Sequence, residues 1–324
     1  MLRVNWMLPG FTPLLPNSTS KGQDNMKILL IDVDSKIPNL ALMKLSAYYK
    51  EKGHDVGFCI SDPDKIYASV IFRKNKHHVD GLKFFYPNAE IDIGGSGYDL
   101  SKKLPDKIEN MKPDYSLYPD IDYSIGFATR GCFRKCHFCI VPEKEGKLKR
   151  THHPKEWHNP EFDKIMFLDN NILGDRDWFF EITNWCIENN LKIWFTQGLD
   201  IRLLDVKIAE QLLKMKIWKS IFFAWDHIGD EKTTKEKIAV LKQAGFTKSK
   251  LKSMVQFYVY VDSDQEYESG VFRCRELKKM NCNPFVMFNI DNKKSKRIKE
   301  LQRWANRKWA FWSCDIADYS RCVA

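Results

Sequence analysis

The stretch from Tyr123 to Cys139, YSIGFATRGCFRKCHFC, decides how the rest of the chain is interpreted. Its first half, YSIGFATR, predicts a β-strand that leads directly into three cysteines, Cys132, Cys136 and Cys139. Gly131 permits the tight turn that such a loop needs at the strand end. Because active sites of β/α barrels lie at the carboxyl ends of the strands, the pattern predicts a ligand-binding loop at a barrel mouth.

Three cysteines without a fourth nearby are an incomplete ligand set for a tetrahedral metal ion. Cysteine thiolates are the usual protein ligands of iron–sulfur clusters, and three of them hold three irons of a 4Fe–4S cluster while one iron stays open. The alternative is a structural zinc site that takes His152 or His153 as its fourth ligand. Neither the spacing nor the barrel context favours zinc.

Downstream of the cysteines, apolar runs alternate with helical patterns. Five further strands are predicted from the runs KIMFLDNN, LKIWFTQGLD, SIFFAWD, SMVQFYVYVD and NPFVMFNID. Helices are predicted around residues 178–189, 205–215, 233–245, 264–280 and 293–309. Six parallel strands joined by right-handed crossovers predict a partial (β/α)6 barrel that is open on one side.

Upstream of the barrel, the sequence predicts a second α/β unit. The runs KILLIDVD, DVGFCI, YASVIF and AEIDIGG are typical of four strands in an open Rossmann-like sheet. Three prolines in residues 101–122 indicate a linker or a surface crossing. We therefore expect a poorly ordered extension at 1–25, a Rossmann-like domain at 26–115, a barrel at 116–292, and a basic helix and tail at 293–324.

Composition restricts the compartment and the partners. The nine cysteines come without a secretory signal, which predicts a reducing, cytoplasmic environment and thiols or metal ligands in place of disulfides. Of these, Cys186 and Cys274 fall on apolar helix faces and are predicted core residues. No apolar run reaches the roughly 18–20 residues that span a bilayer, so no membrane partner is expected. The net charge of +10 suits a nucleic-acid partner, but equally a lysine-rich surface.

The cysteine loop resembles the signature of the radical S-adenosylmethionine (SAM) superfamily, and the resemblance covers residues 123–292. Phe138, before the third cysteine, matches the family's aromatic position, which lies against the adenine of SAM. The resemblance implies a full or partial β/α barrel and a 4Fe–4S cluster whose open iron binds the amino and carboxylate groups of SAM. It also implies reductive cleavage of SAM to a 5′-deoxyadenosyl radical that abstracts hydrogen, with flavodoxin or ferredoxin as the electron donor.

The same resemblance implies SAM contacts at the ends of the later strands, at Asp169, Asn170, Gln197, Arg202 and Asp226. Asp169 and Asn170 stand where the family meets the amino group, although its paired glycines are absent. Arg202 has the chemistry to bind a carboxylate through two hydrogen bonds, and Asp226 is expected at a ribose hydroxyl. Simpler structural roles stay open, namely a cap or turn for Asp169 and Asn170 and an ion pair with Asp200 for Arg202.

The N-terminal unit resembles the cobalamin-binding-like domain that precedes the barrel in one branch of this family. The run DIGGSG, residues 92–97, matches its glycine-rich strand end. That branch carries Asp-x-His-x-x-Gly after the first strand, whereas this chain has DVDSKIPN without a histidine. The difference predicts a degenerate domain that binds no cobalamin. The tRNA methylthiotransferases share TRGC, but they carry three further cysteines where this chain has only Cys59.

The substrate class stays open between a peptide or protein and RNA, and small metabolites also remain open. A peptide would enter the open side of the barrel, whereas RNA would use the basic helix near the C-terminus, with residues Lys294, Arg297, Arg303, Arg307, Trp304 and Trp309. The alternative is that Ile298, Leu301 and the tryptophans pack this helix onto the barrel. A different class of function is a non-catalytic iron–sulfur protein that acts in nucleic-acid binding or electron transfer.

Overall fold

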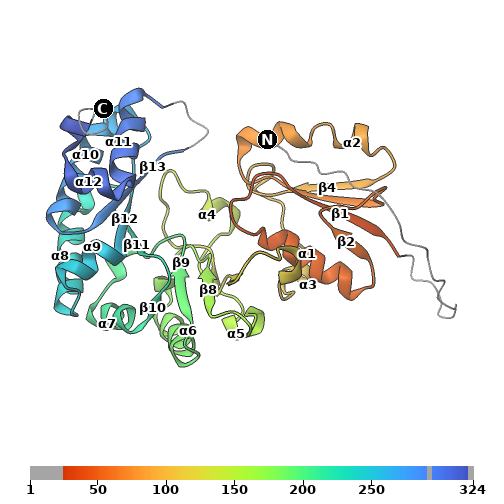
Figure 1. Cartoon of the computed structure of the whole chain (residues 1–324), viewed down its shortest axis with the longest axis horizontal. Coiled ribbons are helices and arrows are strands. Elements are labelled where there is room, and N and C mark those ends of the chain that lie inside the picture. Colours follow the sequence, from red (N-terminus) through yellow and green to blue (C-terminus); the bar gives the residue numbers. More distant parts are fainter. Residues whose placement is uncertain (1–24, 290–293, 320–324) are drawn as a thin grey trace.

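The computed structural model describes residues 25–289 and 294–319, which form two α/β units with parallel sheets (Figure 1). The predicted α/β fold class is therefore confirmed. The predicted extension lies, apart from Asn25, outside the described residues, and so does Cys322. Within the described residues, every helix is too short or too polar to span a bilayer.

The N-terminal unit is a four-stranded parallel sheet in the order β2-β1-β3-β4. Its strands are β1 (Lys27–Asp32), β2 (Asp55–Gly57), β3 (Lys65–Ser69) and β4 (Glu90–Gly94). The helix α1 (Leu40–Glu51) begins at Asn39, whose side chain accepts a hydrogen bond from the backbone N–H of Leu42. Leu42 and Leu45 of this helix are buried in one hydrophobic cluster with Ile28 of β1.

The barrel unit consists of six parallel β/α repeats divided between two sheets. Its strands are β5 (Ser124–Gly126), β8 (Lys164–Phe167), β9 (Lys192–Phe195), β11 (Ile221–Ala224), β12 (Val255–Tyr260) and β13 (Asn283–Met287). A parallel bridge between Leu199 and Phe223 connects the two sheets. The main helices are α6 (Arg176–Glu188), α7 (Val206–Lys214), α8 (Glu231–Gln243), α10 (Tyr267–Lys279) and α11 (Lys296–Asn306).

The barrel differs from the expected pattern in its fourth repeat. A short strand, β10 (Lys216–Ile217), pairs with the start of β9, and β11 begins four residues after it, so this repeat contributes two strand segments. Two short helices were also not predicted, α9 (Lys248–Met254) and α12 (Lys308–Ser313). Both helices are shorter than the roughly 12 residues over which helical periodicity becomes a strong signal.

The expected first barrel strand is interrupted before it reaches the cysteines. β5 ends at Gly126, and β6 (Thr129–Arg130) pairs antiparallel with β7 (Lys149–Arg150). The carboxylate of Asp169 accepts hydrogen bonds from the backbone N–H groups of Ala128 and Thr129, so these groups do not pair with a neighbouring strand. The interruption turns the cysteine loop over the strand ends.

The segment at residues 101–122 is a packed joint between the units and not an exposed linker. It contains α3 (Asp106–Glu109) and a short 3-10 helix at Tyr115–Leu117. Ile108 and Leu117 are buried in the same cluster as Met166 of β8, so one apolar core spans both units. The sequence did not indicate that this segment is packed. Its two buried side chains, Ile108 and Leu117, are nine residues apart and form no periodic apolar pattern.

The basic C-terminal helix packs onto the barrel. Such packing was the expected alternative to an exposed surface that binds RNA. Trp304 and Leu301 of α11 are fully buried. Lys294 pairs with Asp262, and Arg297 pairs with Asp264 at 2.9 Å. These contacts already occupy an aromatic ring and two cations that the RNA hypothesis requires.

Candidate functional site

A cavity of about 1820 Å³ opens between the two units at the carboxyl ends of the barrel strands. Among the predicted site residues, those that line it are Cys132, Cys136, Cys139, Phe138, Asn170, Gln197, Arg202 and Asp226. The opposite wall comes from the N-terminal unit, including Ser96 of the DIGGSG run. Figure 1 shows the loop with the helix α4 (Val141–Lys144) between the two units. The site therefore belongs to both units.

The cysteine loop is held by its own backbone. The N–H of Cys132 donates to the carbonyl of Gly146 at 3.1 Å, and the N–H of Cys139 donates to the carbonyl of Cys136 at 3.0 Å. Gly131 has a φ of +78°, and an added Cβ would lie 2.2 Å from the carbonyl oxygen of Lys147. A glycine is thus required at this position for both its backbone conformation and the close approach.

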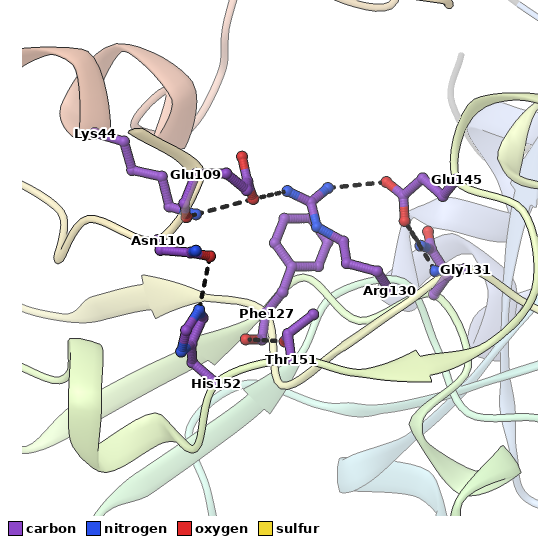
Figure 2. A network of polar contacts seen from close by, with 10 residues as sticks. Lys44, Glu109, Asn110, Phe127, Arg130, Gly131, Glu145, Thr151 and His152 are labelled. Atoms are coloured by element: carbon purple, nitrogen blue, oxygen red, sulfur yellow. Dashed lines mark hydrogen bonds and ion pairs between the residues drawn. The ribbon is translucent and has the colours of Figure 1, made fainter. Parts of the chain in front are cut away.

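Glu145, directly after α4, stabilises this loop through hydrogen bonds of its carboxylate (Figure 2). One carboxylate oxygen accepts from Arg130 Nη1 at 3.0 Å, and the other accepts from the Gly131 N–H at 3.0 Å and from Asn170 Nδ2 at 2.7 Å. Its side chain is only 11% exposed, so solvent screens these bonds little. The amide of Asn170, predicted at the SAM amino group, is thus engaged with Glu145.

A chain of charges continues from Glu145 into the N-terminal unit (Figure 2). Arg130 Nη2 donates to Glu109 at 2.6 Å, and Glu109 also pairs with Lys44 of α1 at 3.0 Å. Burial alone would raise the pKa of Glu109, but the charges of Arg130 and Lys44 outweigh it and hold that pKa below its usual value. The chain connects α1, the interunit joint and the cysteine loop.

Asp169 has a structural position and does not line the cavity. The buried carboxylate accepts from the N–H groups of Ala128 and Thr129, and from Thr129 Oγ1 at 2.7 Å. Burial raises its pKa to about 6, although these hydrogen bonds oppose the rise. Because these donors engage its carboxylate, Asp169 holds the end of the first barrel strand and lies behind the cavity wall.

The other predicted SAM contacts meet one another at the mouth. Arg202 Nε donates to Asp200 at 2.7 Å, which is the ion pair considered as its alternative role, and Arg134 Nε donates to the same carboxylate at 2.8 Å. Burial alone would raise the pKa of Asp200, but the two guanidinium groups outweigh it and lower that pKa. Two arginines therefore share the carboxylate of Asp200 beside the cysteines, and Arg202 also lies 3.9 Å from the carboxylate of Asp230.

An aromatic pair and a buried acid complete the mouth. The ring of Phe138 stacks on Tyr260 with 4.2 Å between centroids and 17° between planes. Asp226 Oδ1 accepts from the backbone N–H of Tyr260 at 3.1 Å, and Gln197 Nε2 lies 3.3 Å from Thr196 Oγ1. Phe138 thus lies at the cavity, where an adenine contact remains a prediction.

The three thiols of the loop are the candidate ligands of the predicted cluster. Within the described residues, no three His, Cys, Asp or Glu side chains converge as ligands of one ion would. The cysteines of a 4Fe–4S cluster each bind a different iron of one cluster, so their sulfurs lie farther apart than the ligands of a single ion. Burial raises the pKa of Cys136, with further contributions from Cys139 and Asp226, and burial likewise raises the pKa of Cys139. Thiolates in such surroundings need a positively charged partner, which cluster irons supply.

Sequence reasoning missed several residues of this site. Glu145 lies in VPEKEGKLKR, where the many basic residues gave no sign that this carboxylate is only 11% exposed. Arg134 lies between two cysteines, and nothing in its spacing indicates a pair with Asp200. Asn171 follows Asn170 in FLDNN, and the repetition itself was the available signal, because it places a second amide at the same strand end.

Gly131→Ala is expected to disrupt the cysteine loop. The left-handed backbone conformation costs a non-glycine residue about 1–3 kcal/mol, and the overlap with the Lys147 carbonyl adds to this. Gly146→Ala is a matched control, because its φ is +74° and nothing lies within 4 Å of its added Cβ. Iron content after reconstitution should fall much further in Gly131→Ala. Equal losses in both variants would contradict the role of the close approach.

The buried carboxyl group of Asp226 is expected to make the free energy of unfolding depend on pH. Burial raises its pKa to about 6 from an ordinary value of 3.8, while the Tyr260 N–H and the charge of Arg273 oppose the rise. Between these values the folded chain keeps a proton that the unfolded chain has released, so the free energy of unfolding falls as pH rises from about 4 to about 6. In urea titrations, the difference between wild type and Asp226→Asn should show this fall. A difference independent of pH would refute it.

Comparison with known proteins gives one distant similarity. No family model matches the chain. The chain is 26% identical over 194 residues to bacteriochlorophyllide d C-8(2)-methyltransferase of Chlorobaculum tepidum. The alignment covers 57% of this chain and 39% of the methyltransferase, so the chain spans about two fifths of the length of this curated relative. The relative is named as a methyltransferase. The substrate in that name is stated for the relative and not for this chain.

Proposed function

We propose that this protein is a radical SAM enzyme that abstracts hydrogen from a substrate held between its two units. The observation that carries the proposal is the loop with Cys132, Cys136 and Cys139, which lies at the barrel strand ends and lines a cavity of about 1820 Å³. Three thiolates leave one iron of a 4Fe–4S cluster open, and that open position is where SAM would bind. The distant similarity to a methyltransferase supports enzymatic chemistry of this broad kind.

When bound, the cluster would supply the electron that cleaves the sulfonium of SAM, and the protein would position the reactants. Arg202 and Arg134, which meet at Asp200 beside the cysteines, would orient the SAM carboxylate. Phe138 would pack against adenine, and Asp226 would meet a ribose hydroxyl. The cavity walls from both units would exclude water from the reaction.

A peptide or protein is the substrate class that we propose ahead of RNA. The basic helix α11 is packed through Trp304, and its Arg297 pairs with Asp264. These contacts engage one of the two tryptophans and one of the cations expected to bind RNA, whereas the cavity between the two units is where an extended segment would bind. A steep salt dependence of RNA affinity, measured on the full chain, would favour RNA instead.

The N-terminal unit is proposed to act without cobalamin. The loop after β1, where the family's histidine motif would lie, is tied to the neighbouring strand end through Asp34. Its carboxylate accepts from the N–H groups of Ile71 at 2.7 Å and Phe72 at 2.9 Å. Stoichiometric retention of corrin absorbance after incubation with hydroxocobalamin and desalting would refute this proposal.

A reducing cytoplasm and a flavodoxin or ferredoxin donor are proposed as the working context, because the cysteines of the described residues are all free thiols. The direct test of the activity is anaerobic reconstitution with iron and sulfide, followed by dithionite and SAM. We expect 5′-deoxyadenosine to form. If an intact cluster gives none, the protein is a non-catalytic iron–sulfur protein, with electron transfer or nucleic-acid binding as its role.

A further inference from the structure

Asn171 brings an amide directly against the first cysteine sulfur. It follows β8, begins the 3-10 helix at Ile172–Gly174, and is 3% exposed at the cavity wall. Its Nδ2 donates to Cys132 Sγ at 3.5 Å, and the backbone N–H of Arg134 donates to the same sulfur at 3.3 Å. Hydrogen bonds to cysteine sulfurs are one of the factors that set the reduction potential of iron–sulfur clusters.

The oxygen of the same amide has no partner. Asn171 Oδ1 is a buried side-chain atom without a hydrogen bond among the described residues. Turning the amide over would not help, because a thiolate accepts hydrogen bonds and the NH2 group must face it. An unsatisfied buried acceptor costs about 1–3 kcal/mol, so its retention calls for an explanation such as a missing ligand.

The neighbouring polar side chains do not serve the same purpose. Asp169 is engaged by the backbone of Ala128 and Thr129, and Asn170 donates to Glu145. Asn171 therefore combines two features that its neighbours lack, a contact to a cysteine sulfur and a buried acceptor at the cavity wall. A ligand with an N–H or ammonium donor would satisfy this acceptor.

We propose that Asn171 is a positioning residue that couples ligand binding in the cavity to the reduction potential of the cluster. The inference rests on the proposed function, with SAM as the ligand. The amino group of SAM would donate to Oδ1, and polarisation of the amide would strengthen the N–H···S bond that Nδ2 already makes to Cys132. The strengthened N–H···S bond would stabilise the more negative, reduced cluster and raise its potential. By linkage, the reduced cluster would bind SAM more tightly than the oxidised one.

The test is an anaerobic redox titration of the reconstituted full chain, with dithionite supplying one electron per cluster and electron paramagnetic resonance reporting the reduced state. In wild type, SAM should shift the midpoint potential to a more positive value. Asn171→Leu removes both the donor and the acceptor, so its potential should be more negative and its shift with SAM smaller. Asn184→Leu is the control, because Asn184 is exposed on α6 and contacts Gln211, away from the cysteines.

Asn171→Asp separates the two halves of the proposal and remains informative if the leucine variant loses iron. An ionised aspartate keeps an acceptor for the amino group but has no N–H for the sulfur. We expect a more negative potential with SAM affinity retained. Potentials and SAM shifts equal to wild type in either cluster-containing variant would overturn the inference. A wild-type chain that assembles no cluster would overturn the proposed function instead, so the two failures are distinguishable.

Discussion

Cys136→Ala is expected to abolish cluster binding and SAM cleavage, whereas Cys274→Ala leaves both in place. Cys136 is one of three thiols that line the cavity, and removal of one leaves two ligands for a cluster that needs three. Cys274 lies on α10, is fully buried, and belongs to the core cluster with Val271 and Leu277. Both substitutions remove a cysteine sulfur, at the cavity in Cys136→Ala and in the hydrophobic core in Cys274→Ala.

Iron content, the absorbance of the reconstituted cluster and the yield of 5′-deoxyadenosine measure this difference. Cys274→Ala is expected to lower the melting temperature, because it leaves a small void in the core, without loss of iron. Cys136→Ala is expected to fold normally in the absence of iron. Retention of a full cluster in Cys136→Ala, or equal iron loss in both variants, would show that the three cysteines are not the ligand set.

The fold was largely predictable because its signals are local. Buried parallel strands such as β1 and β12 are continuous apolar runs, and helices such as α6 and α7 begin at Asp175 and Asp205, whose side chains cap them. The cysteine spacing was equally local, and the strand before it placed the loop at the strand ends. Elements shorter than two helical turns, such as α9, left no such periodic pattern.

The polar organisation of the site was not predictable, because it depends on contacts between distant parts of the chain. Asp169 follows the second barrel strand, but its partners are two amides of the preceding repeat. The sequence left Arg202 between a ligand carboxylate and an ion pair with Asp200, and it gave no sign that Arg134 of the cysteine loop pairs with the same aspartate. Residue type and position at a strand end were enough to predict the region in which the cavity lies. The hydrogen-bond and ion-pair partners of these side chains could be found only from the folded structure.

The joint between the units shows how the N-terminal unit supports the cysteine loop. Lys44 of α1 pairs with Glu109, which pairs with Arg130, two residues before the first cysteine. Lys144 of α4 also reaches the N-terminal unit, where it donates to Ser96 Oγ at 2.6 Å. The cysteine loop thus takes part of its support from outside the barrel, so the barrel alone would lack one side of its site.

Glu145→Ala is expected to release the cysteine loop and lower both stability and iron retention. The substitution leaves the Gly131 N–H and Asn170 Nδ2 without their acceptor and removes one of the two carboxylates that hold Arg130. Leaving a largely buried donor without its partner costs about 1–3 kcal/mol, and Glu109 still holds Arg130 after the substitution. Urea unfolding and the rate of iron release to a chelator measure the two effects.

Glu143→Ala provides the matched control, because Glu143 lies two residues earlier, on α4, and is exposed. We expect it to change stability by less than about 0.5 kcal/mol. A double-mutant cycle with Arg130→Met tests the coupling directly, since the cost of Glu145→Ala should be smaller once Arg130 is gone. If the two costs simply add, Glu145 acts through Gly131 and Asn170 alone, and the charge chain from Lys44 does not reach the cysteine loop.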